Sequence, residues 1–288
     1  MTDLNSLVAQ ELMLKVDPRI SAMASAIAAQ HGAASQAVLF YGSCLREQVF
    51  DGLMLDFYLI VSDYRAAYAK RWLAVANHLI PPNVFPFAHD GLVAKYAVLS
   101  VADFARLNGP HANNVSLWAR FAQPARLVWA ADAAARSAVI AAVAQAAPTL
   151  FALAAPLVDI VEPLTVWRAG FAQTYRAELR AEREDRSGTI VDADPDRYQR
   201  FGAAIEIKLG DRAAAQKRWK RLQYTGKFLS IIRLAKASLT FAGGIDYLAW
   251  KINRHARTEI IIKPWQRRWP LLGALTLVPK LLKQGAVR

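Results

Sequence analysis

The chain has 288 residues, of which 55% are apolar and 20% charged, and its formal net charge is +13 at pH 7. This length and apolar content suffice for one large core or two modest ones. A single cysteine excludes an intrachain disulfide framework, and the five histidines lack the spacing of zinc ligands. The first residues carry charges and no long apolar stretch, so we expect no secretory signal.

The positive charge is concentrated towards the C-terminus. Residues 211–288 contain 17 Lys or Arg against 3 Asp or Glu, a balance of +14. Since the whole chain carries +13, the first 210 residues are close to neutral, at −1. A neutral body with a basic C-terminal region favours contact with an anionic surface, either lipid or nucleic acid.

The N-terminal third predicts a helix followed by a pair of strands. Residues 4–30 are alanine-rich with apolar residues at helical spacing. Residues 38–41 and 53–61 are apolar runs rich in β-branched and aromatic side chains, which predict adjacent strands. A short polar link at residues 46–48 joins them.

The next elements alternate between helix and strand. Residues 65–79 predict a helix that Pro81-Pro82 ends, and residues 93–99 predict a third strand. Residues 100–107 predict a further helix, with Ser100 as its N-cap.

The C-terminal half predicts mainly helix. Residues 137–158 lack Asp, Glu, Lys, Arg and His, but their alanine content predicts a buried or amphipathic helix broken near Pro148, not a membrane span. Residues 182–198 predict a solvated loop, and residues 204–236 a basic helix. The loop contains Asp192, Asp194 and Asp196. These lack the Gly and terminal Glu of a calcium-binding EF-hand.

The strand pair carries a candidate phosphate site. Gly42-Ser43 ends the first strand, where backbone N–H groups and a hydroxyl can approach a triphosphate. Asp56 on the second strand can hold a divalent cation that bridges phosphates. This arrangement is typical of polymerase-β-like nucleotidyltransferases. Their second carboxylate lies two positions later, where this chain has Tyr58, so another acid must come from elsewhere or the site is inactive.

Two further residues near this site have alternative interpretations. Lys95, flanked by apolar residues in the third strand, is either a charge that protects an edge strand or a phosphate ligand. Cys44 has no obvious histidine partner, and we interpret it as a small residue of the turn and not as a nucleophile.

The last segment combines tryptophans with cations ahead of a leucine-rich stretch, which favours a membrane anchor at the lipid interface. Its candidate membrane-binding residues are Trp265, Arg267, Arg268, Trp269, Lys280 and Lys283. One alternative is a packed C-terminal helix with a solvated basic face. Another is stacking of nucleic-acid bases on the tryptophans.

Five segments match a known family in order and spacing, over residues 37–245 or so. They are Tyr41-Gly42-Ser43 with Gln48; Met54-Leu55-Asp56-Phe57; residues 95–100; residues 114–124; and the set Tyr175, Glu178 and Arg180, with a weaker match at residues 236–243. Together they resemble the mitochondrial translocator assembly and maintenance protein family, which are CTP:phosphatidate cytidylyltransferases of the nucleotidyltransferase fold. The chain is similar to a bacterial-type member.

The resemblance implies an α+β fold. Residues 1–135 would form the nucleotidyltransferase core, a small mixed sheet with helices. Residues 136–260 would form a mainly helical domain that completes the active site, and residues 261–288 a basic amphipathic membrane-associating tail. The family likewise lacks a second acid on the strand and has an Asp where this chain has Glu178, so Tyr58 ceases to be an objection.

The resemblance also implies roles for individual residues. The catalytic residues would be Asp56, Lys95 and Glu178, of which Asp56 and Glu178 would bind Mg²⁺ or Mn²⁺. The nucleotide would contact Gly42, Ser43, Arg120 and Lys236, with Arg46 a less certain candidate. Two departures stand out: Cys44 replaces a family glycine, at a strain cost if that position needs a positive φ, and residues 82–87 match a family segment poorly.

The expected reaction joins CTP and phosphatidate into CDP-diacylglycerol and pyrophosphate at an anionic membrane surface, with no DNA partner. The expected location is the inner face of a bacterial cell membrane, or the matrix side of the inner membrane in a mitochondrion. Two alternatives remain open: a nucleotidyltransferase for a soluble small molecule, and an inactive relative that binds membrane or RNA.

Overall fold

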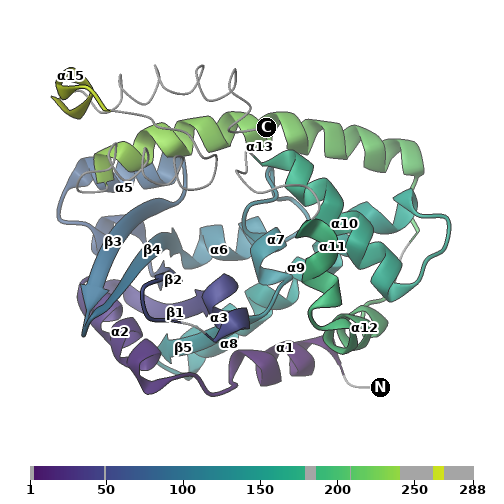
Figure 1. The fold of residues 1–288 in the computed structure, drawn as a ribbon, viewed down its shortest axis with the longest axis horizontal. Helices are drawn as coiled ribbons and strands as arrows, with labels where there is room; N and C mark the ends of the chain where they lie inside the picture. The colour runs from purple at the N-terminus through teal and green to yellow at the C-terminus, as the bar shows by residue number, and fades with distance from the viewer. Residues whose placement is uncertain (1–2, 49, 179–185, 208, 241–261, 269–288) are drawn as a thin grey trace.

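The computed structural model describes residues 3–48, 50–178, 186–207, 209–240 and 262–268 (Figure 1). In these residues a mixed five-stranded sheet is combined with helices, which confirms the predicted α+β class. The strands are β1 (Ser35–Tyr41), β2 (Met54–Val61), β3 (Asn83–His89), β4 (Leu92–Ser100) and β5 (Ala125–Ala130).

The sheet has the order β3-β4-β2-β1-β5. Strands β2 and β4 are parallel, whereas β1 pairs antiparallel with β2 and β5, and β3 pairs antiparallel with β4. The predicted pairing of β1 with β2 and the predicted strand at residues 93–99 are confirmed. Because β4 is an inner strand, the interpretation of Lys95 as an edge-strand charge is wrong.

Alternating side chains divide the core between the two faces of the sheet. On one face Leu39, Ile60 and Leu99 join a buried cluster that also includes Trp118 and Phe171. The residues next to them in each strand point to the other face, where they pack with helix α2 (Pro18–Ala29). By the same alternation Tyr41, Asp56, Tyr58 and Lys95 share the first face.

The helices before the third strand are short. They are α1 (Leu4–Leu12), α2, the 3₁₀ turn η1 (Gly32–Ala34), α3 (Ser43–Glu47), α4 (Tyr64–Ala67) and α5 (Arg71–Leu79). The expected single helix over residues 4–30 is wrong, because Asp17 caps a new helix at Pro18 by accepting the Arg19 N–H at 2.8 Å. The expected helix over residues 65–79 is likewise interrupted, at residues 68–70.

The remaining helices are α6 (Val101–Asn108), α7 (Trp118–Phe121), α8 (Ala133–Ala144), α9 (Ala146–Ala154), the 3₁₀ turn η2 (Ala155–Leu157), α10 (Pro163–Ala177), α11 (Arg186–Asp192), α12 (Pro195–Ala203), α13 (Arg212–Thr240) and α15 (Pro264–Arg268). Ser100 caps α6, as predicted, by accepting the Asp103 N–H. In Figure 1 α13 runs along one side of the molecule, across β3 at one end and α10 at the other.

Strand β3 was not predicted. Residues 82–87 contain two prolines, which argue against a strand, but Pro86 lies on the edge strand of the sheet, where a missing N–H is tolerated. Asp90-Gly91, with φ of 48° and 75°, forms the two-residue turn to β4. An Asp-Gly pair between two apolar runs is a strong hairpin signal, and it could have revealed β3.

The acidic segment also differs from prediction. Of residues 182–198, those from Arg186 onward that the structure describes lie mostly in α11 and α12, so the loop interpretation is wrong for them. Asp194 is the N-cap of α12 and accepts the Arg197 N–H, and Asp192 pairs with Arg168 at 2.7 Å. These carboxylates therefore have structural roles as a cap and a surface ion pair.

The apolar segment forms α8, α9 and η2, with the helix break at Gln145 and not at Pro148. Within the described residues, the stretch Ala133–Leu157 is long and apolar enough to cross a membrane, but 67% of its most apolar window is buried inside the protein. Leu150 and Phe151 of this stretch share one cluster with Trp167 of α10 and with sheet residues such as Leu39. The division into domains at residues 135 and 260 stays a prediction.

Candidate functional site

The centre of the site is an ion pair between two neighbouring parallel strands. Asp56 of β2 lies opposite Lys95 of β4 in the register, and Lys95 Nζ is 3.0 Å from Asp56 Oδ1. Both side chains remain partly accessible, with exposed fractions of 22% for Asp56 and 26% for Lys95. The structure thus brings two of the predicted catalytic residues together on one face of the sheet.

Gly42 allows the turn after β1 to approach this pair. Its φ of 98° and ψ of −166° lie in a region that side-chain-bearing residues rarely adopt. A Cβ at this position would be 3.1 Å from Asp56 Oδ2. Because a side chain here would press on the carboxylate, the glycine provides both the turn and the space beside Asp56.

The residues after Gly42 form the short helix α3. Ser43 is its first residue and is exposed. Cys44 is buried in helical backbone, so it bears no strain from a positive φ, and burial raises the pKa of its thiol. Arg46 Nη1 donates to Gln123 Oε1 at 3.1 Å. Cys44 is therefore a packed residue of the turn, as predicted.

An aromatic layer lies beside Asp56 on the same face. Tyr58, two residues along β2, is 4% exposed, and its ring centroid is 5.1 Å from that of Tyr41 and 5.4 Å from that of Phe121. Burial raises the pKa values of both tyrosines, and for Tyr58 the charges of Arg120 and Arg233 oppose this rise only in part. Tyr58 thus fills the place of the absent second carboxylate as a neutral packing residue.

Glu178 forms an ion pair across the helical side of the site. It directly follows α10 and is 6% exposed, and its Oε1 is 3.5 Å from Arg120 Nη1. Arg120 Nη1 also donates to the carbonyl oxygen of Ser116. Burial opposes the charge of Arg120, but Glu178 and then the two tyrosines raise the pKa of its guanidinium. Arg120 therefore stays a cation.

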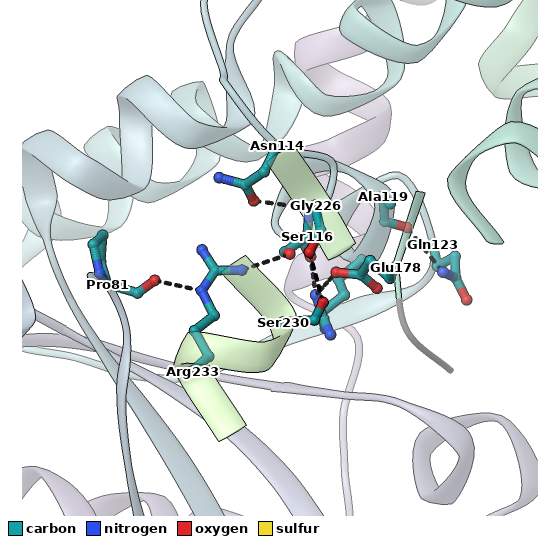
Figure 2. A network of polar contacts seen from close by, with 10 residues as sticks. Pro81, Asn114, Ser116, Ala119, Gln123, Glu178, Gly226, Ser230 and Arg233 are labelled. Atoms are coloured by element: carbon teal, nitrogen blue, oxygen red, sulfur yellow. Dashed lines mark hydrogen bonds and ion pairs between the residues drawn. The ribbon is translucent and has the colours of Figure 1, made fainter. Parts of the chain in front are cut away.

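Helix α13 borders the site where it packs against α10 and β3. A Cβ on Gly226 would be 2.2 Å from the carbonyl oxygen of Ala177, so glycine is required where α13 crosses the end of α10. About two turns further along α13, Arg233 reaches the site, with its Nη1 2.7 Å from Ser116 Oγ (Figure 2). Arg233 was not predicted. Its only sequence signal is its place three residues before Lys236 in a basic helix.

The proposed metal ligands each already have a cationic partner, Lys95 for Asp56 and Arg120 for Glu178. No group of three or more His, Cys, Asp or Glu side chains able to hold a metal is found among the residues that the structure describes. Mg²⁺ in nucleotide sites needs only one or two carboxylates together with substrate phosphates. Asp56, which is partly accessible beside Gly42, fits such a ligand.

Three of the six predicted membrane-binding residues lie outside the described part of the chain. Trp265 lies in α15 and is 43% exposed. The backbones of Arg267 and Arg268 belong to α15, and their side chains are not described; Trp269, Lys280 and Lys283 lie outside the described residues. The tail stays a prediction.

A separate cavity of about 1000 Å³ lies at the carboxyl ends of β2 and β4. Its lining includes Ser62, Tyr64, Arg71 and Ser100, and Tyr64 donates a 2.6 Å hydrogen bond to Asp103. Asp56 and Lys95 lie in the first halves of the same strands, before their carboxyl ends, so this cavity is distinct from the predicted site.

Comparisons with known proteins do not identify a family for this chain. No family model matches the chain, and no curated protein matches it. Among solved structures, the chain is similar to a nucleotidyltransferase-like protein from Exiguobacterium sibiricum 255-15, with a TM-score of 0.29, 11% sequence identity and coverage of 92% of each chain. At that TM-score the likeness carries no argument, and the function has to be inferred from the site itself.

Proposed function

We propose that the chain is a metal-dependent nucleotidyltransferase that transfers the cytidylyl group of CTP to phosphatidate. The observation that carries the proposal is the close approach of the Gly42 turn to Asp56, which is paired with Lys95 on one face of a mixed sheet. A backbone turn, a carboxylate and a cation at one point are what a metal–triphosphate complex needs. The choice of CTP and phosphatidate rests on the sequence resemblance alone.

The chemistry needs positioning more than proton transfer. A phosphate oxygen of phosphatidate attacks the α-phosphorus of CTP in line, the new O–P bond forms, and the bond from the α-phosphorus to the bridging oxygen breaks, which releases pyrophosphate. The attacking oxygen is already anionic near neutral pH, so no strong base is required. Catalysis then depends on alignment and on neutralising charge.

Each residue of the candidate site would have its own role in binding the substrates and neutralising their charge. Gly42 and Ser43 would hold the triphosphate, and Asp56 would bind Mg²⁺, which neutralises phosphate charge when bound. Lys95 would contact the departing phosphates, for which it would exchange its ion pair with Asp56. Glu178 stays a predicted second metal ligand, and its pair with Arg120 is the contact that a metal would have to replace.

A membrane surface would supply the lipid. Helix α13 exposes Tyr224 by 80% and Phe228 by 63%, next to the exposed cations Lys220, Arg221 and Lys227. Exposed aromatic side chains among cations favour an anionic lipid interface. This surface supports peripheral binding independently of the predicted tail at residues 261–288.

The test is the release of pyrophosphate from CTP and Mg²⁺ in the presence of phosphatidate vesicles. We expect release that depends on phosphatidate and is lost in Asp56→Asn, which keeps the size of the side chain and removes its charge. Asp51→Asn, an exposed acid five residues earlier, is the matched control. Release that needs no lipid would indicate a soluble acceptor, and no release from any acceptor would indicate an inactive binding protein.

A further inference from the structure

The cavity of about 1000 Å³ lies where two paired strands separate. Val61, the last residue of β2, pairs with Ser100, the last residue of β4. Beyond them the first segment continues into α4 and α5, and the second into α6. Open sheets bind ligands at the carboxyl ends of parallel strands, in the crevice that diverging connections leave. The cavity therefore has the place of a ligand site, and its volume is at the upper end of the range for small molecules.

Helix α5 forms a fixed wall of this cavity. Its buried Asn77 donates from Nδ2 to the carbonyl oxygen of Val98 at 3.0 Å, which joins the helix to β4. The buried Lys236 of α13 donates to the carbonyl oxygen of Ile80, directly after α5. The side of α5 that faces away from Asn77 lines the cavity with Arg71, Val75, His78 and Leu79.

The acids that line the cavity are engaged, whereas its arginines are not. Asp63 caps α4 by accepting two backbone N–H groups, at 2.7 and 3.0 Å. Asp103 forms an ion pair with Arg106 at 2.6 Å. The exposed guanidinium groups of Arg65 and Arg71 form no hydrogen bond or ion pair with any residue that the structure describes. The charge that the lining offers to a ligand is therefore positive.

The start of α5 adds to this positive region. Lys70 occupies its N-cap position, and no side chain of the described residues caps the helix. The first N–H groups of such a helix favour an anion. Ala69 and Arg71, on either side of Lys70, both line the cavity. The planar forks of Arg65 and Arg71 match a carboxylate or a phosphate, so this end of the cavity favours an anionic group.

The other end of the same wall is apolar. Val75 and Leu79 are exposed to solvent although they line the cavity. Covering such side chains with an apolar ligand removes their surface from water and is favourable. From Arg71 to Leu79 the helix rises about 12 Å. The charged end and the apolar end are thus separated by about the length of a short alkyl chain.

We propose that this cavity binds an amphipathic anion, with its charged group at Arg65 and Arg71 and its alkyl chain along Val75 and Leu79. A fatty acid and an alkyl phosphate are the two sources of this chemistry. The proposal does not rest on the proposed function, because the cavity is lined by neither Asp56 nor Lys95.

The test measures binding by calorimetry, with octanoate in one arm and octyl phosphate in the other. Octanol keeps the chain without the charge, and inorganic phosphate keeps the charge without the chain. We expect at least one of the two anions to bind about tenfold or more tightly than either control ligand. The tighter anion identifies the head group. Absence of binding by both anions, or a control ligand bound as tightly as the better anion, would overturn the proposal.

Two variants locate the ligand in this cavity. Arg71→Gln should weaken the better anion by about tenfold or more, and Leu79→Ser by about threefold to tenfold. The matched controls are Arg136→Gln, at an exposed position of α8, and Leu209→Ser, since Leu209 has the same exposed fraction of 70% as Leu79. Each control should alter affinity less than twofold.

Urea unfolding separates binding from folding. All four substituted positions are exposed, so each midpoint should equal that of the wild type. Affinity that is unchanged in both Arg71→Gln and Leu79→Ser, or that falls equally in the two controls, would overturn the site. Because no transfer is measured, a failure of the proposed function leaves this result intact.

Discussion

Replacing Gly42 by alanine tests whether the turn after β1 is built for Asp56. The backbone at this position has φ 98° and ψ −166°, a region that costs a residue with a side chain about 1–3 kcal/mol. The added Cβ would also lie 3.1 Å from Asp56 Oδ2, so the carboxylate has to shift by a few tenths of an ångström. We expect Gly42→Ala to lose about 2 kcal/mol of unfolding free energy, and transfer activity by about tenfold or more.

Gly32→Ala is the matched control. Gly32 also has a positive φ, 52°, but an added Cβ there meets nothing within 4 Å. We expect a loss of about 1 kcal/mol in stability and an unchanged transfer rate per folded molecule. Urea unfolding gives the free energies, and pyrophosphate release gives the rates. Wild-type activity in Gly42→Ala, or an equal loss of activity in Gly32→Ala, would refute the reasoning.

Three further predictions concern stability. Gly226→Ala places a Cβ 2.2 Å from the carbonyl oxygen of Ala177 and should lower the unfolding free energy by about 3 kcal/mol. A thermal midpoint equal to that of the wild type would contradict this prediction. Glu11→Gln leaves the guanidinium of Arg197, 4% exposed and held by Glu11 at 2.8 Å, without its counter-charge. Urea unfolding should show a loss of about 3–5 kcal/mol, and a loss below about 1 kcal/mol would contradict the pairing. Burial lowers the pKa of Lys236 to about 7, below its unfolded value of about 10.4, so the unfolded chain binds more protons between these pH values. This residue's contribution to stability should therefore rise with pH by about 1 kcal/mol per unit from pH 7.5 to 9.5, and parallel pH profiles of wild type and Lys236→Met would exclude it.

Strands β1, β2 and β4 could be predicted because each has a local signal, whereas β3 and β5 were not predicted. The apolar runs at residues 38–41, 53–61 and 93–99 each became a strand, and Asp56 and Lys95 lie within two of these strands. Their ion pair could not be predicted, because it depends on the parallel register between β2 and β4, which no local pattern specifies.

The helical half of the site was less predictable. Glu178 was found only by resemblance, and its partner Arg120 is 58 residues away in the sequence. Arg233 gave no distinct signal, because a basic residue in a basic helix is usually solvated, whereas its side chain here is half-buried and donates to Pro81 and Ser116. The ion pair of Glu11 with Arg197 joins residues 186 apart and is likewise set by packing.

The most direct measurement follows the nucleotide itself. CTP labelled at the α-phosphorus is incubated with the protein, Mg²⁺ and phosphatidate vesicles, and the lipid and aqueous phases are then separated. The account predicts that the label enters the lipid phase as CDP-diacylglycerol with the wild type and not with Asp56→Asn. Label that stays in the aqueous phase with the wild type, or that enters the lipid equally with Asp56→Asn, would contradict the account.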